Sequence, residues 1–208
     1  MQLSKLENRA YETIRVNAFS VFRTKDLCLL MKIDRTKAYN IIKSLKKKNI
    51  IKNIGKGFFA FNDSEEFIIG TAINYPSYIS FWSALNYYGF SDQTPIKIFI
   101  ATPKYSKQIG NFKYITLSKK RFFGYTKIGQ VAIAEKEKAL IDSLLFPKYS
   151  GGISEIIKCF QSALSEINTK KLVDYAIKTE SKAVLRRLGF ILENLTKKKF
   201  EKLRKKIG

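Results

Sequence analysis

The chain has 208 residues, of which 45% are hydrophobic, and it carries a formal net charge of +22 with no histidine. Without histidine, the sequence excludes His-dependent acid–base catalysis, and two cysteines, Cys28 and Cys159, are too few for the common four-ligand zinc sites. It has no run of 18 apolar residues and no signal peptide, so we expect a soluble cytoplasmic protein with free thiols.

The positive charge is concentrated towards the two ends of the sequence. Residues 1–62 have a formal charge of +10, residues 63–180 of +4 and residues 181–208 of +8. A surface with such an excess attracts polyanions, which means nucleic acid first and anionic membrane second.

The first 62 residues predict three helices followed by a hairpin. The apolar spacing of Leu3, Leu6, Ala10 and Ile14 marks the first helix. Thr24 is expected to cap a short second helix that ends about three residues before Asp34. This order and the short connection are typical of a winged helix-turn-helix.

The segment from Asp34 to Asn49 predicts an amphipathic helix. Its apolar residues recur at i, i+3, i+4 and i+7 and therefore share one face. They are Ala38, Ile41, Ile42 and Leu45. Asp34 is placed to cap the helix start. Many lysine-rich helices are only solvated surface helices, but the neighbouring helix and hairpin favour a DNA-recognition helix.

We expect this helix and the hairpin turn to contact double-stranded DNA. Four side chains near the helix start are predicted to reach base edges: Arg35, Thr36, Lys37 and Asn40. Tyr39 flanks them, while Lys43 and Lys47 are predicted to bind phosphates. Lys56, in the turn of the hairpin, is predicted to reach the minor groove or the backbone.

The hairpin is expected over residues 50–54 and 58–61, and the domain boundary directly after it. This places a winged helix-turn-helix domain at residues 1–62 and a second domain at residues 63–208. Asp63 is expected to cap a helix over residues 67–73 at the start of the second domain.

The second domain predicts a mixed α/β structure, in which a small antiparallel or mixed sheet packs with helices. Strands are expected over residues 96–101, 112–117 and 127–134, the first two antiparallel. Helices are expected over residues 78–88, 135–146, 153–164, 169–178 and 181–195. Phe200, Leu203 and Ile207 share one face of the basic final stretch, which is interpreted as a helix on DNA phosphates, a helix on a membrane or a frayed tail.

Two further clusters raise the question of chemistry. Residues 119–125, KKRFFGY, combine cations with aromatics that could stack on a base, although we favour a loop whose aromatics fold into the core. Glu135, Glu137 and Asp142 are the carboxylates that a nucleotide-acting enzyme would need. Lysines lie between them, so we interpret them as solvated helix-face charges. We expect no catalytic residue, cofactor or metal site.

Five blocks of the sequence carry a resemblance to a known family. They are YPSYISFWSALNYYGFSDQTP at 75–95, IFIAT at 98–102, KRFFGY at 120–125, IAEKEKALIDSLLFPKYSGGISEI at 133–156 and SKAVLRRLGFILE at 181–193. With the expected winged helix in front, most of residues 10–195 resembles the AbiEi-type antitoxins, the regulator half of type IV toxin–antitoxin systems in abortive infection. The middle blocks are the specific part, because a winged helix alone fits many regulators.

The resemblance implies a transcriptional repressor that binds inverted repeats in the promoter of its own operon. It also implies that the second domain counters a nucleotidyltransferase-like toxin without forming a stable complex. We expect a monomer in solution and no membrane partner. Two alternatives stay open: an enzyme acting on nucleotides or RNA that docks through the winged helix, and a ligand-sensing regulator without a toxin.

Overall fold

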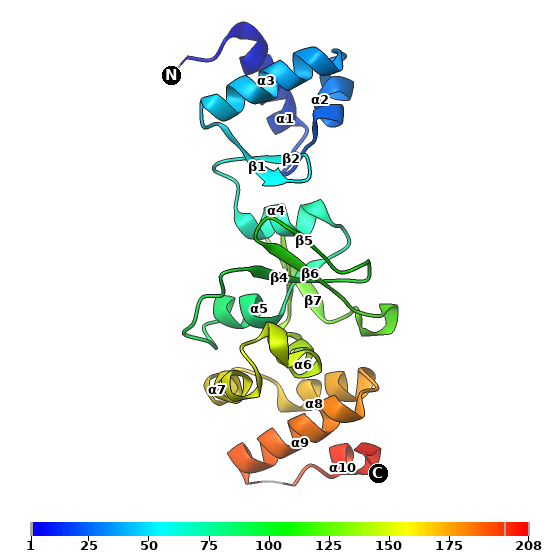
Figure 1. Cartoon of the computed structure of the whole chain (residues 1–208). Coiled ribbons are helices and arrows are strands. Elements are labelled where there is room, and N and C mark those ends of the chain that lie inside the picture. Colours follow the sequence, from blue (N-terminus) through cyan, green and yellow to red (C-terminus); the bar gives the residue numbers. More distant parts are fainter. Residues whose placement is uncertain (1, 198, 208) are drawn as a thin grey trace. The chain divides into compact units, whose positions relative to one another are not determined.

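The computed structural model describes residues 2–197 and 199–207. The chain forms two compact units, Met1–Ile73 and Asn74–Gly208 (Figure 1), which we call the N-terminal unit and the C-terminal unit. The division falls after Ile73 and not directly after the hairpin, where the sequence analysis places the domain boundary. Each unit combines helices with a small sheet, which confirms the α+β class.

The N-terminal unit consists of helices and one hairpin. Their order is α1 (Lys5–Val16), α2 (Thr24–Met31), α3 (Arg35–Lys47), β1 (Ile51–Gly55), β2 (Phe58–Phe61) and α4 (Glu66–Ile73). The two strands are antiparallel. An isolated antiparallel bridge between Phe22 and Phe59, with hydrogen bonds of 2.9 and 2.8 Å, ties the segment before α2 to the hairpin.

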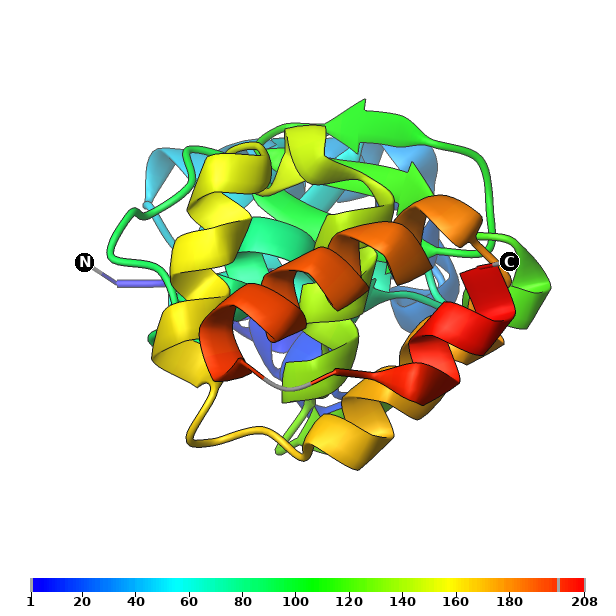
Figure 2. The same ribbon diagram turned by 90° about the horizontal axis from the view of Figure 1, so that it is seen from below.

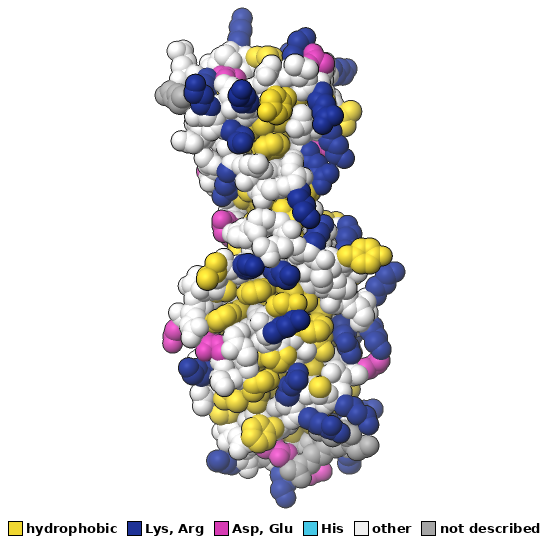
Figure 3. Space-filling view, in the orientation of Figure 1, with side chains coloured by type: hydrophobic (Ala, Val, Ile, Leu, Met, Phe, Trp, Pro, Cys, Tyr) yellow, Lys and Arg dark blue, Asp and Glu magenta, His cyan; other side chains and the backbone are white. Residues whose placement is uncertain are grey.

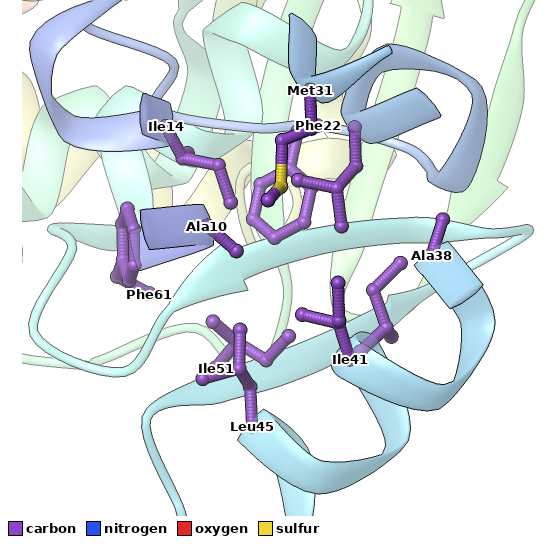
Figure 4. Close-up of a cluster of buried hydrophobic side chains, with 11 residues drawn as sticks. Ala10, Ile14, Phe22, Met31, Ala38, Ile41, Leu45, Ile51 and Phe61 are labelled. Atoms are coloured by element: carbon purple, nitrogen blue, oxygen red, sulfur yellow. The ribbon is translucent and has the colours of Figure 1, made fainter. Parts of the chain in front are cut away.

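Apolar side chains from α1, α2, α3 and the hairpin form one core, and Figure 4 shows them pointing towards one another. The four apolar residues predicted for α3 are all buried, which confirms the predicted face. Asp34 caps α3 as predicted, because its Oδ1 accepts the N–H of Lys37 at 2.8 Å. The helix therefore begins where the sequence indicates and buries the side that the apolar spacing defines.

Three local predictions for this unit were wrong. Leu6 is 43% exposed, so it does not belong to the core face of α1. Arg23, not Thr24, occupies the cap position of α2, and the carboxylate of Asp26 accepts its N–H at 2.8 Å. Asp63 forms an ion pair with Arg15 and lies three residues before the first residue of α4, Glu66, so it does not occupy the cap position.

The C-terminal unit contains a six-stranded mixed sheet in the order β5-β6-β4-β3-β8-β7. The strands are β3 (Tyr78–Ile79), β4 (Ile98–Thr102), β5 (Lys107–Ile109), β6 (Phe112–Thr116), β7 (Tyr125–Ile128) and β8 (Val131–Ala134). The pairs β4–β6 and β3–β8 are parallel, and the other neighbours are antiparallel. The two strands expected to be antiparallel, near 98 and 112, each have one antiparallel neighbour, β3 and β5, and they pair with each other in parallel.

Two expected elements of this unit have a different form. Tyr78 and Ile79 were expected to begin a helix but form β3 in the middle of the sheet, because both side chains are buried there between β4 and β8. Residues 127–134 were expected as one strand but lie on the two strands β7 and β8, since Gly129 adopts φ +59° at the turn.

The helices of the C-terminal unit surround α6. They are α5 (Phe81–Tyr87), α6 (Lys136–Leu145), α7 (Ile153–Ala163), α8 (Thr169–Lys178), α9 (Lys182–Thr196) and α10 (Glu201–Ile207), with the short 3-10 turns η1 (Lys119–Arg121) and η2 (Pro147–Tyr149). α6 contacts α5, α7, α8 and α9. Figure 2 shows α9 crossing over α6, with α7 on one side and α8 and α10 on the other.

The basic final stretch forms a docked helix. Leu203 is fully buried, and α10 packs against α8 and α9. The frayed-tail interpretation was therefore wrong. Phe200 is half-buried, and the side chain of Ile207 lies outside the described residues. One side of α10 is buried against its own unit, so the lysines of the helix lie on the opposite, exposed side.

Candidate nucleic-acid interface

All eight residues predicted to contact DNA are exposed. Arg35, Thr36, Lys37, Tyr39, Asn40, Lys43 and Lys47 lie on α3, and Lys56 lies in the turn between β1 and β2. Tyr39, the one large ring among them, is 60% exposed. α3 thus separates an apolar face in the core from a polar and basic face in solvent.

A basic hollow of about 550 Å³ adjoins the start of α3. It is lined by Arg23, Thr24, Lys25, Cys28, Leu29, Arg35, Lys56 and Gly57, and we call it the α2–α3 hollow. It brings together Arg35 and Lys56, which the sequence analysis identified, with Arg23 and Lys25, which it missed. Four cations from the starts of two helices and the hairpin turn therefore converge, and no acidic side chain lines the hollow.

The local fold explains this convergence. The bridge between Phe22 and Phe59 holds the start of α2 beside the hairpin, and the guanidinium of Arg23 lies 3.8 Å from the ring centroid of Phe58. Gly57 adopts φ +75° in the hairpin turn, a conformation that favours glycine. The walls of the hollow come from segments distant in sequence, which is why spacing alone does not reveal it.

One sequence signal could have identified Arg23 and Lys25. Cations at the start of a helix face the positive end of the helix dipole and do not stabilise the helix. Arg23 and Lys25 both lie there, at the N-terminal end of α2. Their position lowers the stability of the isolated helix but favours the binding of an anion, because the helix N-terminus and both cations attract it together.

A polar cluster holds α3 from its inner side. The carboxylate of Glu7, on α1, accepts the N–H of Ser4 at 2.6 Å and the Ser44 hydroxyl of α3. Lys48, just after α3, lies 2.6 Å from the same carboxylate. These hydrogen bonds, from Lys48 and Ser44 first, lower the pKa of Glu7 from 4.5 to about 2. The cluster ties α1 to α3 and fixes the helix that carries the predicted contacts.

The three carboxylates considered for catalysis all have internal partners. Asp142 is fully buried, pairs with Lys138, and accepts hydrogen bonds from Tyr78 at 3.1 Å and Ser80 at 2.8 Å. Glu135 accepts the Tyr175 hydroxyl, and Glu137 accepts the N–H of Asn168 at 2.8 Å. The interpretation as solvated charges was wrong for Glu137 and Asp142, which are buried because helices cover α6 on several sides, whereas Glu135 is partly exposed.

The buried pair perturbs the titration of its members. Burial lowers the pKa of Lys138, and the negative charge of Asp142 opposes that shift. Burial, reinforced by Asp142, raises the pKa of Tyr78 well above its usual value. The Lys138 ammonium also lies 4.8 Å from the ring centroid of Phe123. The site is closed to solvent, so it serves the packing of α6 against the sheet.

The basic and aromatic cluster at residues 119–125 folds two of its three aromatic side chains inward. Phe122 packs against Tyr78 and Tyr125, with centroids 5.0 and 5.1 Å away. Phe123 packs edge-on against Tyr175 at 5.2 Å. Phe122 and Phe123 are half-buried and Tyr125 is 43% exposed, so the favoured interpretation of a core loop is confirmed only for the two phenylalanines, while the lysines of η1 stay exposed.

The described part of the chain lacks two kinds of feature. No group of three or more cysteine, aspartate or glutamate side chains could hold a metal ion there. No helix among the described residues has the length and apolar content that crossing a membrane requires.

Comparison with known proteins defines the fold class. No protein-family model matches the sequence, and no curated protein matches it. Among solved structures, the chain is similar to the crystal structure of the RV2827C protein from Mycobacterium tuberculosis, with a TM-score of 0.66 and 12% sequence identity. The match covers 99% of this chain and 82% of that chain. At this identity, the similarity concerns the fold alone.

Proposed function

We propose that the protein is a sequence-specific transcriptional repressor that binds double-stranded DNA through a winged helix-turn-helix in its N-terminal unit. In this proposal α2 and α3 form the helix-turn-helix and the β1–β2 hairpin is the wing. The observation that carries the proposal is the division of α3: its apolar face is buried, and all seven predicted DNA-contacting residues on it are exposed.

The dimensions of α3 suit the major groove. Its 13 residues span about 20 Å, and the groove of B-form DNA is wide enough to admit a helix. Asn40 offers the amide that pairs with adenine, and Arg35 the fork that pairs with guanine. Lys43 and Lys47, further along the helix, then neutralise phosphates.

The α2–α3 hollow supports this proposal. Three of its four cations, Arg23, Lys25 and Lys56, are placed to take a backbone phosphate beside the start of α3, which would fix the register of the helix on the duplex and leave Arg35 for the base edge. We therefore add Arg23 and Lys25 to the eight contacts expected from the sequence. Lys56, at the wing tip, lines the same hollow.

The second part of the proposal is that the protein is the antitoxin of a type IV system. It rests on the resemblance to the AbiEi-type antitoxins, which implies binding to promoter inverted repeats and neutralisation of a nucleotidyltransferase-like toxin without a stable complex. The five blocks that carry the resemblance include β3, α5, β4, α6, η2 and most of α9, together with parts of η1, β8 and α7. They therefore account for much of the C-terminal unit, to which we assign the neutralising activity.

The DNA proposal is tested by gel shift with the DNA upstream of the gene against scrambled DNA of equal length, at two salt concentrations. We expect a preference for the upstream fragment that persists at the higher salt. If about five phosphates are neutralised, log affinity falls against log salt with a slope near −4.5. Equal and steeply salt-sensitive binding to both fragments would exclude specific readout.

Two variants refine this test. Asn40→Ala should lose about 10-fold or more of the preference for the upstream DNA, because a bidentate base contact contributes about 1–3 kcal/mol of discrimination. The control variant Asn8→Ala changes an exposed asparagine on α1 and should keep the wild-type preference for the upstream DNA. A variant Asn40→Ala with full discrimination removes Asn40 from the set of base-reading residues.

The antitoxin proposal is tested by co-expression with the product of the adjacent gene. Wild-type protein should restore growth that the adjacent gene product arrests. Asn40→Ala should restore growth equally when both genes are driven by a foreign promoter, since neutralisation is assigned to the C-terminal unit. No restoration by wild-type protein contradicts the antitoxin proposal and leaves the repressor proposal intact.

A further inference from the structure

The C-terminal unit carries more positive charge than the N-terminal unit. Residues 74–208 have 25 Lys/Arg and 10 Asp/Glu, a formal charge of +15, against +7 for residues 1–73. The proposed binding of operator DNA by α3 and the α2–α3 hollow does not involve the excess positive charge of the C-terminal unit. Figure 3 shows Lys and Arg side chains along one edge of the unit, from η1 to α10.

Part of this charge surrounds a second hollow, of about 490 Å³. It is lined by Ile177, Lys178, Glu180, Lys182, Leu185 and Lys206, and we call it the α8–α10 hollow. Its three lysines come from three different helices: the end of α8, the start of α9 and α10. All three are exposed. Helices packed through their apolar sides thus bring like charges together around one concave surface.

The acidic residue of the hollow does not neutralise these lysines. Glu180 forms an ion pair with Lys120 of η1, and that contact lowers the pKa of the carboxyl group. Within the described residues, Lys182 and Lys206 form no ion pair, and Lys178 lies 4.2 Å from the ring centroid of Phe123. The rim therefore has a net positive charge that an external anion can balance.

We propose that the α8–α10 hollow binds the sugar–phosphate backbone of a nucleic acid, as a second site separate from the winged helix. Lys178, Lys182 and Lys206 each neutralise a phosphate. The apolar floor of Ile177 and Leu185 keeps the lysine ammonium groups at the rim, where a flexible backbone reaches them.

The hollow binds the backbone and not the bases. No aromatic side chain lines it, so it offers no platform on which a base could stack. The nearby ring of Phe123 is packed against Tyr175 and covered by lysines. Binding at this site is therefore independent of sequence and strongly dependent on salt.

The packing of α10 favours nucleic acid over a membrane. A helix that lies on a membrane inserts an apolar face into it. The apolar side of α10 is already used, because Leu203 is fully buried and the helix packs against α8 and α9. Among the described side chains of α10, those that are exposed are all charged, which matches a phosphate backbone.

The test compares two triple variants of the full chain. Lys178→Gln, Lys182→Gln and Lys206→Gln together remove the three charges of the hollow. The matched control removes three exposed charges elsewhere on the same unit, through Lys127→Gln, Lys148→Gln and Lys158→Gln. Far-UV circular dichroism and tryptophan fluorescence verify that both variants are folded.

Fluorescence anisotropy then measures binding of a 20-nucleotide RNA, a single-stranded DNA of the same sequence and a duplex without operator, over a range of salt. Loss of three phosphate contacts should weaken binding of a single strand about 100-fold at 0.1 M salt and reduce the salt slope by about 2. The control should bind as wild type does. A loss confined to RNA or to DNA identifies which backbone is bound.

Two outcomes overturn the proposal. One is that the hollow variant binds each of the three nucleic acids as tightly as wild type does, or that the hollow variant and the control lose affinity to the same extent. The other is a loss of binding to vesicles with anionic headgroups and to no nucleic acid. The preference of the hollow variant for upstream over scrambled DNA should stay unchanged, so failure here is distinguishable from failure of the winged-helix proposal.

Discussion

Replacing Glu7 by glutamine tests how the N-terminal unit holds α3. Glutamine keeps the volume and can still accept the N–H of Ser4 at the helix start, so mainly the charge is lost. A pKa of about 2 in place of 4.5 corresponds to about 3 kcal/mol of stability at neutral pH. Since glutamine retains part of the hydrogen bonding, we expect Glu7→Gln to lower the free energy of unfolding by about 2 kcal/mol at pH 7.

The dependence on pH identifies the charge as the cause. A carboxyl group whose pKa is lowered by folding contributes stability that is complete above its unfolded pKa, near 4.5, and is lost as the pH falls through about 2. The wild-type advantage over Glu7→Gln should therefore shrink between pH 4.5 and 2. Near pH 2 the two proteins should have nearly the same stability.

Urea unfolding followed by far-UV circular dichroism gives the free energies. Trp82, the one tryptophan, lies in the C-terminal unit and reports on that unit by fluorescence. Glu12→Gln, an exposed position on the same helix, should change stability by less than about 0.5 kcal/mol. A difference between wild type and Glu7→Gln that stays constant from pH 7 to pH 2 would refute the assigned role of the charge.

Three further predictions concern the rest of the chain. Asp142→Asn should cost about 3–5 kcal/mol in a urea titration followed by tryptophan fluorescence, because it leaves a buried ammonium without its counter-ion. Gly124→Ala should destabilise by about 2 kcal/mol more than Gly129→Ala in the same titration, since both have positive φ but only at Gly124 would a Cβ meet other atoms, the nearest at 2.9 Å. A thiol reagent at pH 8 should modify Cys28 in the native protein and Cys159 only after unfolding, because burial raises the pKa of Cys159 to about 11; two fast-reacting thiols would contradict this.

The parts of the molecule that could be predicted from sequence are those that local chemistry determines. α3 is the clearest case, because Asp34 supplies the cap and the spacing of four apolar residues defines the buried face. The caps of α8 and α9, Asn168 and Ser181, follow the same rule. Surface exposure of the candidate DNA contacts follows in turn, since a helix with one buried face exposes the other.

What could not be predicted depends on partners distant in the chain. β3 is only two residues long and is a strand because β4 and β8 lie on either side of it. The α2–α3 hollow needs the bridge from Phe22 to Phe59, and nothing local indicates that pairing. Asp142 was expected to be a solvated charge on a helix face, because the sequence does not indicate how completely α6 is covered.

The buried pair on α6 has a consequence for how the C-terminal unit assembles. A helix with apolar side chains around most of its circumference can dock against its neighbours in several rotations at similar cost. Rotating α6 would carry Asp142 away from Tyr78 and Ser80 and place an uncompensated carboxylate among apolar groups. The pair therefore favours one rotational orientation of α6 over the others. Replacing both residues with leucine would make α6 more hydrophobic but would remove this preference for a single orientation.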